Sequence, residues 1–506
     1  MNKKDFKTKL WQGLRPILFP LNILVSTLYI LWRIVHLPLD SIAIIASLLL
    51  LIVEIVSIFE VNIQLLASNL MQKHTVNYEV IDERLIHDYP TVDVLIPTYS
   101  ESREILAETI AHAKRLNYPQ NAYQITLCDD GEREEIKELC QNFGVGYIPH
   151  QNDGGAKASN LNHALAQING EYVTVLDADN LVHEDFLKQT LSAIRKLDRE
   201  GFVQASEQLH DGMIDQFQKG LKISDDSQLA FNEFIQPSRN GFQGATCCGH
   251  LVLFNRKALD EVGGFDTTTI TEDFMTGMRM HERGYQSVAL HYVGGKVLPA
   301  RNFNGLIKQY QRWSTGNIQG GVRALMKMKL NALQKSTYYR MVTTWLSGVK
   351  QPILLAVSAF MVLTQLPIMK VNIYEFLIVF GIYYSLHKLS NYWILGFRRT
   401  PSVDSMINFV TFPYLVKTNL SAIFQNKQRK FYVTSKKQEG VRTQRETFRL
   451  ALPFYVLMIF EISLLIHGWL TLSFFMFDFS VIWMYAWVMA NLIKSIKGIL
   501  FIIETD

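Results

Sequence analysis

Acidic side chains stand close together at three places in this sequence, and such carboxylates can bind cations or move protons. Asp129-Asp130 and Asp177-Ala178-Asp179 each follow a short apolar segment, and Thr271-Glu272-Asp273 precedes an apolar-periodic one. The two carboxylates of an Asp-x-Asp pair can share one divalent cation, and their oxygens suit Mg²⁺ or Mn²⁺, which would also hold a substrate diphosphate. An Asp after a strand is often only a turn former, so the pair alone is weak evidence.

The segments around these acids have the pattern of one α/β domain. We predict strands at 92–97, 123–128 and 172–176, and helices at 101–115 and 156–168. This alternation predicts a largely parallel sheet that is covered on both faces. Ligands of such sheets bind beyond the carboxyl ends of the strands, which is where the acids stand.

Two common nucleotide-binding patterns are missing from the sequence. No Gly-x-Gly-x-x-Gly follows the first strand, and no Gly-x-x-x-x-Gly-Lys-Ser/Thr occurs. The interpretations as a dinucleotide-dependent dehydrogenase or a P-loop NTPase therefore lose their main support. For Thr271-Glu272-Asp273 taken alone, an ordinary helix cap before Phe274, Met275 and Met278 is the preferred interpretation.

Apolar runs flank the polar middle of the chain. Of 506 residues, 48% are hydrophobic and 19% charged, which argues against a disordered or purely soluble protein. Six runs approach the length that spans a hydrocarbon core of about 30 Å. They are 17–32, 41–59, 345–369, 373–395, 451–472 and 474–493. A signal sequence or interfacial helix is the alternative for the first run, although no small-residue cleavage site follows it.

The positions of basic residues predict the orientation of the chain in the membrane. Lys and Arg gather before the first run and in the 397–448 loop. We therefore expect both termini, the polar middle and this loop in the cytosol, and all four cysteines reduced. A net charge of +4 is too small to argue for nucleic acid. Glu60 and Lys350 lie near the spans. Each either lines an internal cavity or extends its charged end to the membrane interface, and we rate these two interpretations equally.

Five separated motifs follow one another in the order of the D, DxD, TED and QxxRW pattern. They are Ile96–Tyr99, Asp129–Gly131, Asp177–Asp179, Thr271–Asp273 and Gln309–Trp313. In this order the chain resembles the processive family 2 glycosyltransferases. Three further segments resemble the cellulose synthase branch: Lys157–Asn162 (KASNLN), Gln236–Arg239 (QPSR) and Phe431–Lys436 (FYVTSK), which fits an FxVTxK gating loop.

The resemblance implies a GT-A-like cytosolic α/β domain inserted between about two N-terminal and four C-terminal transmembrane helices, with amphipathic interface helices. The implied parts are an N-terminal segment with spans 1–2 (1–69), the glycosyltransferase domain (70–300), interface helices with QxxRW (301–344), spans 3–4 (345–396), an interface helix with the gating loop (397–448) and spans 5–6 (449–506).

The activity implied is inverting transfer of a sugar from a UDP-sugar, with UDP-glucose as first choice. The product would be a β-glucan exopolysaccharide or capsule, moved through the enzyme's own channel in the plasma membrane. Alternatives are a chitin- or hyaluronan-like synthase using UDP-N-acetylglucosamine, a non-processive transferase acting on a lipid carrier, and a non-enzymatic scaffold. The partners implied are the UDP-sugar, the growing polysaccharide and the bilayer, without nucleic acid; a homo-oligomer is left open.

The resemblance also implies residue roles. Asp273 would be the general base, with Glu272 beside it, and Asp179 with Asp177 would hold Mg²⁺ or Mn²⁺. The nucleotide would meet Thr98, Tyr99, Glu101, Asp129, Asp130, Lys157, Asp177, Gln309, Arg312, Thr434 and Lys436. The acceptor would meet Trp313, Cys248, Gly249 and His250. His250 stands where the family has a small hydroxyl residue, which leaves the linkage open.

Overall fold

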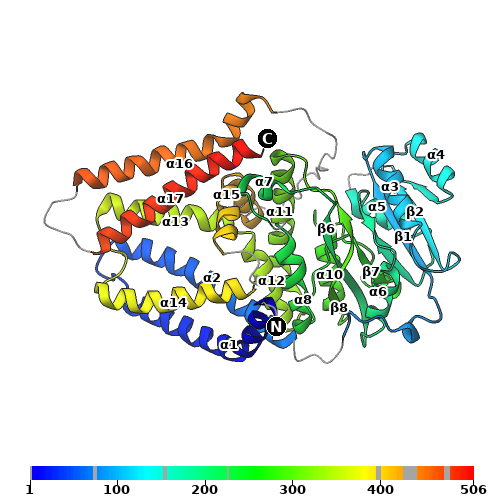
Figure 1. Cartoon of the computed structure of the whole chain (residues 1–506), viewed down its shortest axis with the longest axis horizontal. Coiled ribbons are helices and arrows are strands. Elements are labelled where there is room, and N and C mark those ends of the chain that lie inside the picture. Colours follow the sequence, from blue (N-terminus) through cyan, green and yellow to red (C-terminus); the bar gives the residue numbers. More distant parts are fainter. Residues whose placement is uncertain are drawn as a thin grey trace.

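The computed structural model describes residues 3–71, 77–151, 156–224, 227–394, 401–424, 442–471 and 479–505. Within these ranges a mixed α/β domain lies at one end of the molecule and a group of long helices at the other (Figure 1). The predicted gating-loop residues Thr434 and Lys436 lie outside the described residues.

One sheet of eight strands forms the centre of the α/β domain, in the order β3-β2-β1-β4-β7-β6-β8-β5. The strands are β1 (Val92–Thr98), β2 (Tyr123–Asp129), β3 (Gly146–Pro149), β4 (Tyr172–Val175), β5 (Leu181–Val182), β6 (Glu200–Leu209), β7 (Val252–Asn255) and β8 (Gln286–Val297). The first four in this order are parallel, as predicted. The prediction of a largely parallel sheet did not foresee that β7 runs antiparallel to β4 and β6, or β5 to β8.

Helices cover both faces of the sheet because successive side chains of a strand point to opposite faces. Val94 and Ile96 of β1 belong to one core, with α3 (Arg103–Ala113), α4 (Glu134–Phe143) and α6 (Phe186–Ile194). Leu95, between them, belongs to the opposite core, with α5 (Ala156–Leu165) and α9 (Arg256–Glu261). The predicted helices at 101–115 and 156–168 are therefore confirmed as α3 and α5, both slightly shorter than expected.

Long helices form the other end of the molecule. They are α1 (Lys3–Val35), α2 (Ala43–Met71), α13 (Ser347–Thr364), α14 (Ile373–Ile394), α16 (Gln444–Thr471) and α17 (Phe479–Glu504). All of them except α14 contain a stretch long and apolar enough to cross a membrane. The described residues thus hold two N-terminal and three C-terminal candidate spans, which corrects the expected four. The sequence of α14 includes Glu375, His387 and Lys388, which lower its mean hydropathy.

Although α14 falls short on hydropathy, it packs among the candidate spans. Tyr383 of α14 stacks on Tyr29 of α1 with ring centroids 3.9 Å apart. Figure 1 shows α14 running beside α1 and α2 in the same layer. A GT-A-like α/β domain between candidate membrane helices, the expected fold class, is confirmed with this correction to the number of spans.

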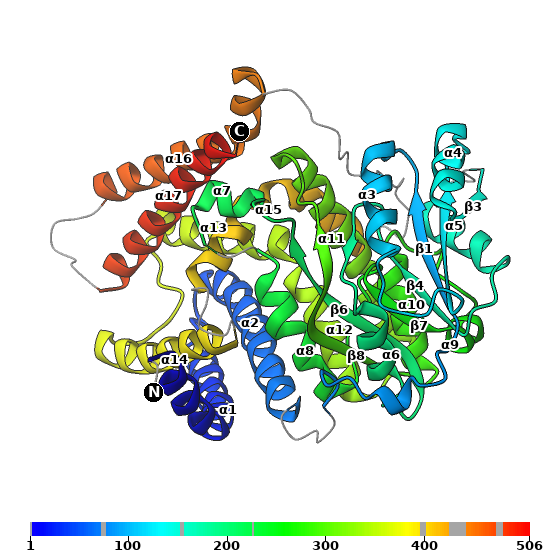
Figure 2. The same cartoon turned by 45° about the vertical axis from the view of Figure 1, so that its right-hand side comes forward.

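Three helices lie where the two ends of the molecule meet. They are α11 (Phe303–Lys327), α12 (Ala332–Thr344) and α15 (Pro401–Phe424) (Figure 1). Figure 2 shows the short helix α7 (Gln216–Leu221) next to α17. Phe501 of α17 packs there against Phe217 of α7 and Phe303 of α11, so the last helix is attached directly to the α/β domain.

Candidate active site

A cavity of about 820 Å³ opens at the carboxyl ends of the central strands and extends to α11. Most of the predicted site residues line it, although they are widely separated in the sequence. These are Thr98, Tyr99, Glu101, Asp130, Lys157, Asp177, Asp179, Cys248, His250, Glu272, Asp273, Gln309, Arg312 and Trp313. Their convergence follows from the fold, because β1, β2 and β4 are adjacent parallel strands that end at one edge.

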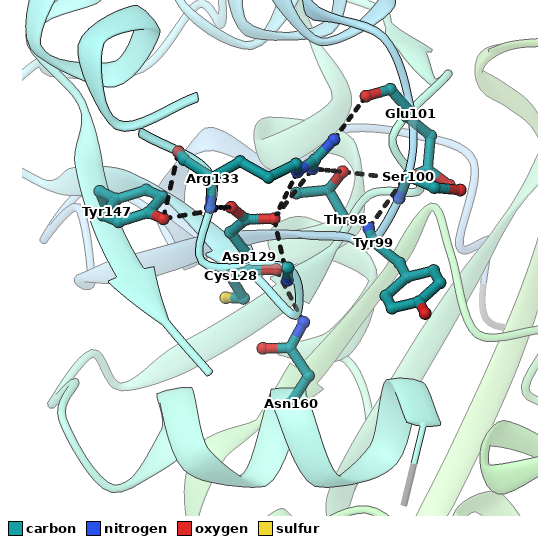
Figure 3. A network of polar contacts seen from close by, with 10 residues as sticks. Thr98, Tyr99, Ser100, Glu101, Cys128, Asp129, Arg133, Tyr147 and Asn160 are labelled. Atoms are coloured by element: carbon teal, nitrogen blue, oxygen red, sulfur yellow. Dashed lines mark hydrogen bonds and ion pairs between the residues drawn. The ribbon is translucent and has the colours of Figure 1, made fainter. Parts of the chain in front are cut away.

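Asp129 is an exception among the predicted nucleotide ligands, since it does not line the cavity. Its side chain is fully buried and is paired with Arg133, whose Nη2 lies 2.8 Å from Oδ1. The same guanidinium donates to the Thr98 hydroxyl at 2.8 Å and to the Glu101 carbonyl at 2.7 Å (Figure 3). Asp129 therefore positions the loop after β1 through Arg133, a residue that our sequence reasoning missed.

Glu101 holds the same loop from inside. Its Oε2 accepts hydrogen bonds from the Thr98 hydroxyl and the Tyr99 amide, both at 2.8 Å, and from the Ser100 amide at 3.1 Å (Figure 3). The turn is thereby closed around one carboxylate, while the Tyr99 ring stays exposed at the cavity. An exposed aromatic ring on a fixed loop offers a flat surface to a ligand base or sugar.

Lys157 is one of the cations that line the cavity. Its Nζ donates to Asp177 Oδ1 at 2.6 Å and to the Gly249 carbonyl at 2.8 Å. Burial alone would lower the pKa of Lys157, but the Asp177 and Glu272 carboxylates more than compensate and raise it. The ammonium group is therefore charged at neutral pH and available to an anionic ligand.

Glu272 and Asp273 stand in the first turn of α10 (Glu272–Glu282). Thr271 occupies the N-cap position and makes no side-chain capping bond, whereas Asp273 Oδ1 accepts from the Phe274 amide at 2.7 Å. The helix-cap interpretation therefore does not account for the pair. Burial, reinforced by the neighbouring Asp273 carboxylate, raises the pKa of Glu272 to about 7. Burial also raises the pKa of Asp273 above its ordinary value.

Gly249 lies behind the Asp273 carboxylate. Its φ is +80°, and a Cβ there would lie 2.6 Å from Asp273 Oδ2. A residue without a side chain is thus needed both for the backbone conformation and for the close approach. Cys248, before it, lines the cavity, and burial raises the pKa of its thiol, which stays protonated.

His250, after Gly249, carries a charge that the family pattern does not include. Its Nε2 pairs with Glu207 Oε2 at 3.0 Å, and its Nδ1 lies 3.2 Å from Asn180 Oδ1. Burial would lower the pKa of His250, but the Asp177 and Glu207 carboxylates raise it to about 9. Glu207 was missed by sequence reasoning, because it lies within a strand and outside every motif.

The donor groups of Asp177 and Asp179 fit a divalent cation that is shared with a substrate. Both carboxylates line the cavity, and the Leu298 amide donates to Asp179 Oδ2 at 3.1 Å. No group of three or more His, Cys, Asp or Glu ligands meets within the described part of the chain. Mg²⁺ commonly takes one or two protein carboxylates and completes its shell with phosphate oxygens and water, which agrees with this donor set.

Gln309, Arg312 and Trp313 reach the cavity from α11. Trp313 meets Trp345, which caps the carboxyl end of α12 just before α13, edge to face with ring centroids 6.0 Å apart. The cavity therefore has an acidic and basic wall from the α/β domain and an aromatic wall on the side of the long helices.

Comparison with known proteins gives one family for the α/β domain. Residues 90–316 match the family described as "Glycosyltransferase like family 2". A UDP-forming cellulose synthase catalytic subunit of Xanthomonas axonopodis pv. citri (strain 306) is 31% identical over 242 residues, which are 47% of this chain and 32% of that protein. Cellulose synthase 1 catalytic subunit, UDP-forming, of Komagataeibacter xylinus is 27% identical over 72% of this chain and 49% of that protein.

The chain spans about a third to a half of the length of these curated relatives. Among solved structures, a mannosyltransferase from Pyrobaculum calidifontis in complex with GDP-Man and Mn²⁺ aligns with a TM-score of 0.46 and 16% identity. That alignment covers 72% of this chain and 100% of the mannosyltransferase chain.

Proposed function

We propose that this chain is a processive and inverting UDP-sugar polymerase of the plasma membrane. Its residues 90–316 match the glycosyltransferase family 2 model, and bacterial cellulose synthase catalytic subunits are among its relatives. The main support is the convergence in one cavity of the adjacent Glu272-Asp273 carboxylates, the Lys157–Asp177 ion pair and the α11 residues Arg312 and Trp313. Acids, cations and an aromatic platform are the groups that glycosyl transfer from a diphosphate needs.

In the proposed reaction an acceptor hydroxyl attacks the sugar's anomeric carbon as the bond to the diphosphate breaks. Asp273 accepts the proton of the attacking hydroxyl, which requires hydrogen-bond reach between the two oxygens. Lys157 and Arg312 stabilise the negative charge that grows on the departing UDP. Trp313 stacks against the apolar face of the acceptor sugar. A divalent cation held by Asp177 and Asp179 would neutralise further diphosphate charge.

UDP-glucose is the proposed donor and a β-glucan the proposed product. The relatives are named as UDP-forming cellulose synthases, and the FxVTxK segment favours the same branch. UDP-N-acetylglucosamine is the alternative donor, and glycosylation of a lipid carrier the alternative reaction. We propose that both termini and the catalytic domain lie in the cytosol and that the polymer channel lies among the long helices.

Polymer synthesis by the purified chain tests this function. The protein in lipid nanodiscs is incubated separately with radiolabelled UDP-glucose, UDP-N-acetylglucosamine and UDP-galactose, and the products are sized and digested with linkage-specific glucanases. We expect a long glucanase-sensitive polymer from UDP-glucose alone, and none from Asp273→Asn. A short lipid-linked product would contradict processivity, and a polymer made only from UDP-N-acetylglucosamine would contradict the proposed donor.

A further inference from the structure

An ion pair on the cavity wall joins Glu207, which lies outside every recognised motif, to His250. Glu207 and His250 both line the cavity, and their side chains are 24% and 17% exposed. The general base, the diphosphate cations and the aromatic platform are already assigned to other residues. A charged pair that faces a substrate cavity therefore needs a role of its own.

The fold directs Glu207 into this cavity through an irregularity in its strand. The pairing of β6 with β8 shifts register between Gln204 and Ser206 and again between Ser206 and Glu207. Such bulges turn a side chain away from its regular direction, and they occur often beside active sites. Glu207 is opposite Gly295, which presents no side chain of its own on this stretch of β8.

His250 is fixed on both sides of its ring. Asn180 Oδ1 accepts the Asp177 amide at 2.9 Å, so this atom is an acceptor and the Nδ1 of His250 beside it must donate. Nε2 faces a carboxylate and must donate as well. With both ring nitrogens donating, the imidazole is protonated, and it pairs with the Glu207 carboxylate.

The backbone also fixes the position of His250. Gly249 and Leu251 on either side of His250 both have positive φ, +80° and +48°. The His250 carbonyl accepts a hydrogen bond from Gln204 Nε2 at 2.9 Å. Because Gln204 and Glu207 lie on the same strand, the carboxylate and the imidazolium that orients it are held by one rigid element.

The second carboxylate oxygen of Glu207 remains available to a ligand. His250 pairs with Oε2, and among the described residues no hydrogen bond or ion pair involves Oε1. A carboxylate of fixed orientation accepts hydrogen bonds from hydroxyl groups, and the charge makes each bond stronger than a neutral one. Neutral polyols are the matching ligand class, because the imidazolium already balances the negative charge.

We propose that Glu207 is a specificity-determining residue that accepts hydrogen bonds from saccharide hydroxyls in this cavity, and that His250 is the positioning residue that orients its carboxylate. This inference rests on the proposed function, since it takes the saccharide to be the donor or acceptor sugar of the polymerase. It assigns to His250 a different role from the direct acceptor contact that the sequence implied.

Glu207→Gln in the full-length protein tests the role of the carboxylate. We expect kcat/KM for polymer synthesis to fall about 10-fold to 100-fold, because a charge-assisted hydrogen bond is lost. The inhibition constant of free UDP should stay within about twofold. A rise in KM for UDP-glucose would place the contact on the donor, and a rise in KM for a short gluco-oligosaccharide would place it on the acceptor; either supports the proposal.

Asp211→Asn is the matched control, because it breaks an ion pair with Lys296 at the surface. The Asp211 side chain is 88% exposed. If Glu207→Gln retains the activity of this control while the wild type makes polymer, the inference is overturned and the proposed function stands. Parallel loss of UDP affinity would also overturn it, since the contact would then be to the nucleotide. Thermal unfolding midpoints of both variants show whether lost activity reflects misfolding.

His250→Ser, which restores the small hydroxyl residue of the family pattern, tests positioning. If His250 acts through Glu207, the double variant should lose no more activity than Glu207→Gln alone. Losses that multiply would show that His250 contacts the sugar independently, and would overturn the positioning role. The split between KM and kcat separates this effect from a general loss of structure.

Discussion

Asp273 differs from the other carboxylates of the cavity in how its charge is managed. Asp130 is paired with His150 at 2.5 Å, and Asp177 is paired with Lys157. Asp273 is half-buried beside Glu272, and only the Phe274 amide and more distant cations favour its ionised form. A carboxylate with a raised pKa and no ion-pair partner close by is a better proton acceptor than one held in an ion pair.

Replacing Asp273 by Asn should abolish catalysis and spare nucleotide binding. The amide keeps the shape of the side chain but cannot accept the proton, so we expect kcat to fall about 10²- to 10⁴-fold. Calorimetric titration with UDP checks that affinity stays within a few-fold of the wild type. If UDP binding disappears as well, Asp273 contributes to the nucleotide site and another residue must be the base.

The rate of polymer synthesis should depend on pH with an acid limb above the ordinary aspartate range. Asp273 accepts a proton only when its carboxylate is ionised, and burial raises the pKa of that carboxyl group. As the pH drops, activity should therefore fall at a higher pH than the ordinary pKa of an aspartate would give. Measurement of kcat/KM against pH in buffers of constant ionic strength checks this. An acid limb in the ordinary carboxyl range would contradict the raised pKa of Asp273.

A methyl group at Gly249 should displace the base. In Gly249→Ala the new Cβ would lie 2.6 Å from Asp273 Oδ2, so the carboxylate must move. We expect a loss of kcat approaching that of Asp273→Asn, with UDP affinity retained. Gly263→Ala is the matched control, since Gly263 has a similar φ of +84° and open space around the new methyl. Equal losses in both variants would mean that backbone strain, rather than displacement of Asp273, is the cause.

At the scale of elements, the packing of α10 on α11 brings the base to the aromatic platform. Gly316 of α11 lies against Thr271, and Gly320 lies 3.3 Å from Phe274, measured from an ideal Cβ. Small residues one turn apart let the two helices approach closely. The base on α10 and the Arg312-Trp313 pair on α11 are therefore held at a distance that these glycines set.

Gly316→Ala should separate the two helices. The added methyl would overlap the Thr271 hydroxyl, next to Glu272, so α10 must shift relative to α11. We expect a reduction of kcat of at least about tenfold, because small displacements of reacting groups are costly. Gly381→Ala on α14, where the new methyl meets nothing within 4 Å, should leave activity unchanged. Wild-type kcat in Gly316→Ala would show that the spacing is not critical.

At the scale of the whole molecule, α17 connects the long helices to the catalytic domain. Phe501 is fully buried between Phe217 and Phe303, and Gly220 of α7 leaves room for its ring. The Lys222–Glu504 ion pair lies nearby but is exposed, so it adds little stability. Apolar packing, rather than charge, holds the domain against the last helix.

Phe501→Ala should weaken this connection. Removing a fully buried Phe costs about 3–5 kcal/mol, so we expect a clearly lower thermal midpoint in nanodiscs and a loss of polymer length. Ile503→Ala on the same helix removes a side chain that is 50% exposed, and should have a much smaller effect. Similar midpoints for the two variants would contradict a structural role for Phe501.

The sequence alone was enough for those features that depend on neighbouring residues. The strand β1 and the helices α3 and α5 follow from the apolar pattern of the sequence. The roles of Asp177, Asp179, Glu272 and Asp273 came only from the order of motifs that resembles family 2 glycosyltransferases. Length and hydropathy predict six apolar runs, and the run at 373–395 coincides with α14, although polar residues keep its hydropathy below that of the five candidate spans.

Only the tertiary structure decided which side chains face the cavity. Asp129 and Asp130 are adjacent, yet one is buried behind Arg133 and the other lines the cavity. Glu207 enters through a bulge between β6 and β8, strands about 80 residues apart in the sequence. Gly249 is required by a contact with Asp273 on another element. Local propensities carry little information on such long-range register and packing, which arise only when the sheet and the helices assemble.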